Sequence, residues 1–383
     1  MTTDAEDRPT WPRNGQVIRR AELLRLIEEN GGPDGLDLRG AILVGDRPSD
    51  NPVDNPIDLS REALAPLAAA YRRANPGSEP PWIAQHGGVR LDRAQMQSAY
   101  IRGALLDEAH LSGVHLEDAI LSEATLPGAH LVAAHLDRAY VSATDMMSTD
   151  LTYAELGGAT AFGTYLRDAS LAYANLRRVD LYQVLSLQGV RWYGAFLSHT
   201  RIKRESLGKA IGDEIDAEKE RTAEAYHRAK EAYLLLKNNF NQIGRYEDAS
   251  WAYVKEQQME KMAYHWEWRS QGWQVWRGWG SFWRWLRNWA YELATGYGER
   301  PWNPVIGGVL AILGFAAGFC ATRAVANLWD ALIYRLATFA TFNLADTGPT
   351  GRGADVASSV EALLGIAVLA LVVFTLGNKM SRG

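Results

Sequence analysis

The sequence is poor in the groups that support covalent, redox or metal chemistry. Cys320 is the single cysteine among 383 residues, so no intramolecular disulfide can form. It lies in an apolar run, where a small buried side chain is expected. The chain has no Walker loop, no nucleophile–base pair and no Cys/His cluster with metal-ligand spacing. We therefore expect neither an enzyme nor a bound cofactor.

Charge of one sign and an N-terminal leader are also missing. The 40 basic and 45 acidic residues give a net charge of -5, which offers no reason to expect a nucleic-acid partner. The opening residues MTTDAEDRPTWPRNGQ contain no apolar run after a basic segment, unlike a secretory signal. Long apolar runs occur only near the C-terminus, so we expect most of the chain to lie in the cytoplasm.

From Val89 onward the sequence repeats every five residues. Each unit has a large apolar residue in its third place and a small or β-branched residue two places earlier. The large residues are Leu91, Met96, Ile101, Leu106, Leu111, Leu116, Leu121, Leu126, Leu131, Leu136, Val141, Met146, Leu151, Leu156, Leu166, Leu171, Leu176 and Leu181, with Ala161 as the small exception. A period of five fits neither a helix nor a flat strand. It fits a coil in which each unit forms one side of a square and the rungs stack about 4.8 Å apart.

This pattern resembles the pentapeptide-repeat family, whose motif is A-(D/N)-L-x-x. The resemblance covers about Gly88 to Ser198, with an outlying unit LDLRGAILVG at Leu36 to Gly45. It implies a right-handed quadrilateral β-helix, whose open ends need caps. The segment from Asp46 to Pro81 is a candidate cap. Some relatives are DNA mimics that bind topoisomerases, a role that the weak acidity of this repeat does not favour.

Histidines recur at outward positions of the repeat. Residues twenty apart should lie above one another, which places His110 over His130 and His115 over His135. Imidazole side chains in such columns predict a metal-binding or pH-sensitive patch. The alternative is a solvated face that tolerates histidine.

Helical patterns replace the repeat after Thr200. Residues 201–265 read as a helical hairpin that acts as a spacer. Residues 266–302 hold most of the chain's 14 tryptophans, interleaved with arginines. The steps between Trp276, Trp279 and Trp283 predict a helix lying flat at a membrane interface.

The C-terminal residues, 303–383, carry two apolar runs that predict membrane spans at about 303–322 and 360–378. Basic residues flank the outer ends of both runs, so the positive-inside rule places both termini in the cytoplasm and the spans in the inner, or plasma, membrane. Between them, residues of about 328–342 read as a short helix too brief to span, typical of a re-entrant segment.

The order of span, short helix, loop and span resembles the two-transmembrane pore domain of the potassium-channel superfamily. Together with the segments GYGERPW and SSVEALLGIAVLALVVF, it resembles a bacterial family of pentapeptide-repeat proteins that carry this pore. The resemblance implies four subunits around a pore. It places the filter at Thr341, Phe342, Asn343, Leu344, Ala345 and Asp346. Both glycines of the family's T-x-G-(Y/F)-G-D filter are absent, which favours a poorly selective cation pathway or a non-conducting plug.

Two residues of the second span are further candidates for a pore. Glu361 can brace the short helix or line a vestibule. Gly365 can act as a hinge or allow close helix packing.

The sequence thus predicts a multidomain protein with an N-terminal segment at 1–87, a β-helix at 88–200, and the connector, interfacial helix and pore domain given above. We expect a homotetrameric, cation-permeable channel in the lipid bilayer, whose β-helix is a sensor or a docking platform for an unknown protein or ligand. The alternative is a membrane-anchored scaffold with a non-conducting pore-like domain. A DNA mimic is the third possibility.

Overall fold

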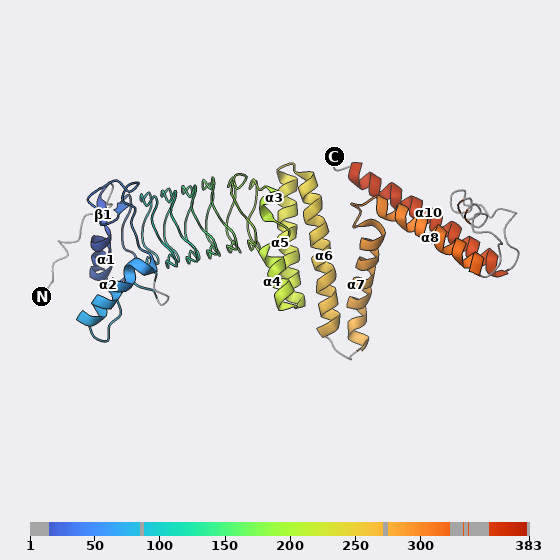
Figure 1. Cartoon of the computed structure of the whole chain (residues 1–383), viewed down its shortest axis with the longest axis horizontal. Helices are drawn as coiled ribbons and strands as arrows, with labels where there is room; N and C mark the ends of the chain where they lie inside the picture. The colour runs from blue at the N-terminus through green and yellow to red at the C-terminus, as the bar shows by residue number, and fades with distance from the viewer. Residues whose placement is uncertain are drawn as a thin grey trace. The chain divides into compact units, whose positions relative to one another are not determined.

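The computed structural model describes residues 15–84, 88–270, 275–321, 332, 336 and 352–380. The chain divides into two compact units, Met1–Met259 and Glu260–Gly383. The first contains the repeat and the helices that follow it, and the second contains the apolar helices (Figure 1).

The five-residue repeat folds as a β-helix, as predicted. Parallel bridges join residues twenty apart, such as Arg90 to His110 and His110 to His130, so four units complete one coil. Figure 1 shows these coils stacked in succession. The large residue of each unit points inward: Leu111 and Leu131, for example, are no more than 1% exposed. Burial of these stacked side chains is the main stabilising term of the unit.

Nearly every corner of a coil is a four-residue turn with a left-handed residue in its third place. In the first such turn of the main repeat, the Ala94 N–H donates to the Leu91 carbonyl oxygen at 3.2 Å. Arg93, the third residue, has a φ of 56°. Such a turn favours glycine at that place, yet Glu108 and Ala133 occupy equivalent corners with positive φ.

The N-terminal end of the array is closed by elements that precede the main repeat. Strand β1 (Val17–Arg19) pairs in parallel with β2 (Ile42–Val44), and Ile42 bridges to Tyr100 in the first full coil. The outlying unit predicted from Leu36 to Gly45 is therefore a rung of the same stack. Helix α1 (Arg20–Glu29) follows the outermost rung and buries four aliphatic side chains.

The predicted cap segment from Asp46 to Pro81 does contain a helix, α2 (Arg61–Ala74). Ser60 caps it, because its hydroxyl accepts a hydrogen bond from the Ala63 N–H. Further elements also stand at this end, because β1 and α1 lie beyond the outlying unit.

One unit of the array has six residues instead of five. Beyond Leu181 the bridges join residues 21 apart, as between Tyr165 and Ser186. The extra residue is Leu185, whose N–H donates to the Thr164 carbonyl at 3.0 Å while its side chain is 57% exposed. This is a β-bulge. The inward ladder then resumes with Leu187, Trp192, Leu197 and Ile202.

Three helices follow the last coil: α3 (Arg204–Leu207), α4 (Gly212–Glu220) and α5 (Ala223–Gln242). Within the predicted helical hairpin of residues 201–265, α4 and α5 are separated at Arg221, which has a left-handed φ of 53°. Thr222 then caps α5 through the Ala225 N–H.

Two buried side chains of these helices satisfy the open edge of the array. The Asp213 carboxylate accepts from the backbone N–H groups of Trp192 and Tyr193 at 2.6 and 3.2 Å. The Asn239 amide accepts from the Thr200 N–H and donates to the Thr200 carbonyl. An unpaired sheet edge is thereby covered.

The second unit is helical. Among its described residues, the helices with defined bounds are α7 (Val275–Thr295), α8 (Trp302–Ala321) and α10 (Arg352–Met380). They are preceded by α6 (Tyr246–Ser270), which crosses the division between the units. Helices α8 and α10 run side by side (Figure 1). The tryptophan-rich stretch predicted as one interfacial helix over 266–302 is divided between the end of α6 and α7.

Among the described residues, one helix is long and apolar enough to cross a bilayer. It is the part of α10 from Ser359 to Gly377, with a mean hydropathy of 2.4. The apolar part of α8, Trp302–Ala317, is shorter. The structure thus supports the predicted span at about 360–378 by length and composition, and the span at about 303–322 stays a prediction.

Candidate functional site

The predicted histidine columns exist, and they are built by the bridges between coils. His115 bridges to His135, which in turn bridges to Glu155. His110 bridges to His130 in the neighbouring column. These side chains lie on the residue before each inward leucine, so they face outward while the leucine anchors the backbone behind them.

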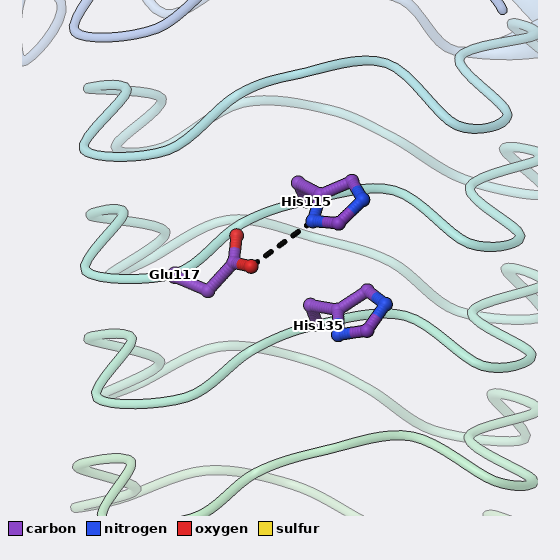
Figure 2. Close-up of side chains that lie close together, drawn as sticks. All are labelled: His115, Glu117 and His135. Atoms are coloured by element: carbon purple, nitrogen blue, oxygen red, sulfur yellow. Dashed lines mark hydrogen bonds and ion pairs between the residues drawn. The ribbon is translucent and has the colours of Figure 1, made fainter. Parts of the chain in front are cut away.

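In the first column the two imidazoles meet a carboxylate. The rings of His115 and His135 stack with centroids 4.4 Å apart and planes 2° from parallel. Glu117, in the corner that follows His115, places its Oε1 atom 3.0 Å from His115 Nδ1 (Figure 2). One ligand atom from each residue lies within 4.8 Å of the others, and all three residues are half-buried. Two adjacent coils therefore contribute to one cluster, which we call the histidine–glutamate cluster.

The surroundings of this cluster are acidic. Burial raises the pKa of Asp137 above its ordinary value, and the carboxylates of Glu155 and Glu117 raise it further, opposed by Arg138 and His135. The Asn175 amide donates to Glu155 at 2.6 Å and fixes that carboxylate. A cation placed here would be favoured electrostatically.

The second column differs in its neighbours. The rings of His110 and His130 lie 4.7 Å apart but are tilted by 59°. Asp150, the next residue of this column, accepts hydrogen bonds from the backbone N–H and the hydroxyl of Thr152. Within the described residues, only the histidine–glutamate cluster brings three potential metal ligands together.

Glu117 was missed by the sequence reading because it lies in a corner position. Such positions hold varied and mostly polar residues throughout the repeat, so residue type alone does not mark this one. A usable signal was present in the spacing, since a residue two places after an outward histidine sits at the adjoining corner.

The predicted filter residues, Thr341, Phe342, Asn343, Leu344, Ala345 and Asp346, lie outside the described residues, as does nearly all of the predicted short helix at 328–342. Glu361 and Gly365 lie on α10 and are both buried. Their spacing of four residues puts them on one face of the helix, while Leu363 and Ile366 are exposed. Their roles in a pore stay predictions.

A second surface feature is an exposed apolar area around the bulge. Phe162, Tyr165, Tyr182 and Leu185 are each at least 40% exposed. They are contiguous, because the Gly163 N–H donates to the Gln183 carbonyl and Tyr165 bridges to Ser186. We call these four residues the aromatic patch.

Known proteins support the repeat and nothing beyond it. Residues 94–131 and 149–185 match the family of pentapeptide repeats, with eight copies. Four five-residue repeats complete each coil, and their large apolar side chains form a ladder in its interior. The repeat region is therefore a β-helix. The chain is a pentapeptide-repeat protein. No curated protein sequence matches it.

Several solved structures resemble the repeat. A trypsin-treated variant of QnrB1, a plasmid-mediated fluoroquinolone resistance protein, is 15% identical with a TM-score of 0.22; the match covers 44% of this chain and 65% of that one. HetL, involved in heterocyst differentiation regulation in the cyanobacterium Nostoc, is 19% identical with a TM-score of 0.16; the match covers 49% of this chain and 93% of HetL. A pentapeptide-repeat protein from the Arabidopsis thaliana thylakoid lumen is 27% identical with a TM-score of 0.13; the match covers 26% and 59% of the two chains.

Proposed function

We propose that this protein is a membrane-anchored scaffold whose pentapeptide β-helix docks a protein partner. The observation that carries the proposal is the exposure of α10. Most of the segment from Ser359 to Gly377 is uncovered within the chain, with only 17% of it buried. An apolar helix with large aliphatic side chains on its surface needs an apolar medium, and a bilayer supplies one.

The aromatic patch is the proposed docking surface. Bulges are common where a sheet presents side chains for function, and here the bulge residue Leu185 is part of the patch. Arg201, Lys203 and Arg245 place their cationic groups 5.4, 5.7 and 5.8 Å from the centre of the Tyr182 ring. An exposed apolar surface beside cations is complementary to a protein segment that carries acidic and apolar side chains. We therefore commit to such a segment as the occupant.

Anchoring is tested by extracting membranes with alkaline carbonate. The full chain is expected to stay in the membrane pellet, and a chain ending at residue 301, which lacks both apolar helices, is expected in the supernatant. A full chain that is released by carbonate would overturn the anchor.

Docking is tested by placing a photo-crosslinking amino acid at Phe162 or Leu185 in cells, with Asp118 as a control position elsewhere on the array. The proposal expects one discrete adduct from the two patch positions, lost at high salt because the contact is partly ionic. Equal adducts from the control position, or adducts that salt does not affect, would remove the docking surface.

A cation channel is the second candidate, and it rests on the chain order. Two apolar helices, α8 and α10, pack along each other, and residues 322–351 connect them. The sequence of that connection resembles a pore segment. Purified protein in planar bilayers under asymmetric potassium, sodium and chloride tests it. Discrete cation currents would favour the channel, and their absence from a protein that anchors normally would favour the scaffold.

A further inference from the structure

We propose that His115, Glu117 and His135 form a binding site for a divalent transition-metal ion of the zinc type, which would tie two adjacent coils of the β-helix together. This site is independent of the anchor and of the aromatic patch. The fold of the repeat does not require these ligands, because in the same two coils the columns without histidine carry Ile120 and Tyr140, or Thr125 and Asp145, at the bridged positions.

The donor set matches the chemistry of zinc. Two imidazole nitrogens and one carboxylate oxygen are ligands that Zn²⁺ accepts, and a fourth position stays open to water. Tetrahedral coordination with Zn–N bonds of 2.0–2.1 Å puts ligand atoms about 3.3 Å apart. The three atoms already lie within 4.8 Å of one another. Small side-chain rotations therefore close the site without moving the backbone.

One carboxylate oxygen of the cluster lacks a hydrogen-bond partner among the described residues. Glu117 Oε1 faces His115, but Oε2 is buried and has no hydrogen-bond partner among the described residues. A buried carboxylate oxygen without a partner is costly. A metal ion at the cluster would remove that cost and balance the acidic surroundings formed with Glu155.

The coil stacking makes the site stiff. His115 and His135 belong to consecutive rungs whose backbones are hydrogen-bonded, since the Leu116 N–H donates to the His135 carbonyl at 2.7 Å. Stacked parallel rings are therefore held in register before any ion arrives. A preorganised pair of ligands loses little conformational freedom on binding.

The neighbouring column offers a matched control. His110 and His130 are also twenty residues apart and close in space, but they belong to no three-ligand cluster among the described residues. A double substitution there removes the same number of imidazoles from the same array. Any nonspecific effect of surface histidines would be shared by both pairs.

The test is isothermal titration of Zn²⁺ into the tag-free full-length protein in detergent, with Co²⁺ absorption as a spectroscopic check on ligand type. We expect one tight site per chain. His115→Ala with His135→Ala should weaken it at least tenfold, and Glu117→Gln should weaken it by a similar or smaller factor. His110→Ala with His130→Ala should leave it within about twofold. Zn²⁺ should also raise the Tm of the wild type and of the control pair, but not of the cluster variants.

Three results would overturn the site. They are the absence of a stoichiometric Zn²⁺ event, an affinity that survives loss of His115 and His135, or an equal loss in the control pair. Far-UV circular dichroism establishes that each variant is folded. Glu117→Gln keeps the shape of the side chain, so a loss of binding in that variant cannot be attributed to disrupted packing.

Discussion

The β-helix and helix α10 are both rich in leucine, but the β-helix buries its leucine side chains, whereas α10 exposes many of them. Leu131 lies inside the coil and is 0% exposed, whereas Leu369 on α10 is 53% exposed. In the β-helix, the repeat has a period of five residues, so the third residue of each five-residue unit points into a shared interior. In α10, apolar side chains surround the helix, so one neighbouring helix cannot cover them all. The same residue type therefore predicts a self-contained core in one unit and an external apolar medium in the other.

The largest expected effect on the free energy of unfolding comes from truncating a leucine in each of these two regions. Leu131→Ala should lower the free energy of unfolding by about 2–5 kcal/mol, because it opens a cavity in a closed interior. Leu369→Ala, the control on α10, should change it by less than about 1 kcal/mol in detergent. Urea unfolding of the full-length protein, followed by circular dichroism, measures both.

An equal loss from the two leucine variants would contradict the contrast. It would mean that the exposed face of α10 is packed against further protein, as in a tetramer. Crosslinking of the same detergent sample would then show the oligomer directly.

The next effect concerns the capped end of the array. Asn239→Ala removes both hydrogen bonds to the Thr200 backbone and leaves a buried N–H and carbonyl without their partner. We expect a loss of about 1–3 kcal/mol. Asn238→Ala, one residue earlier on α5 and exposed, should stay within about 0.5 kcal/mol. If both variants lose the same amount, the two hydrogen bonds between Asn239 and the Thr200 backbone contribute nothing specific.

The other cap residue gives the end of the array a pH dependence. Burial raises the pKa of Asp213 from its ordinary value of 3.8 to about 6, although two backbone N–H groups favour the charged form. The folded protein then binds this proton more tightly than the unfolded chain does. The resulting stabilisation is full below pH 3.8 and is lost as pH rises through about 6.

Asp213→Asn should remove that component. The difference in unfolding free energy between the wild type and this variant should shrink by about 1–3 kcal/mol as pH rises from 4 to 7. Urea midpoints of both proteins across this range measure it. A difference that is constant with pH would show that Asp213 is already ionised at pH 4.

The repeat could be predicted because every five-residue unit carries the full apolar pattern in its own sequence. An inward leucine and a small partner recur locally, so Leu91 through Leu181 and the columns twenty apart followed from the sequence. The bulge did not follow, because Leu185 is an ordinary apolar residue and one insertion hides the ladder that continues at Leu187. Asp213 and Asn239 were missed for another reason. Their partners lie 20 to 39 residues away, at a distance that only the folded cap makes short.

Substitutions at the corners have the smallest expected effect, and they test whether the local sequence alone determines the backbone of the repeat. Ala133 adopts a φ of 55° at an exposed corner, a conformation that glycine adopts without steric cost. Ala133→Gly should therefore stabilise the protein by about 0.5–1 kcal/mol. Gly128 is the corner that precedes it, with a φ of 67°, and a Cβ there would meet Glu108 at an ordinary 3.8 Å. Gly128→Ala should destabilise by a similar amount through the backbone alone. If both substitutions destabilise the protein, side-chain contacts along the stack outweigh the backbone cost at these corners. The repeat would then tolerate residues other than glycine there because of those contacts.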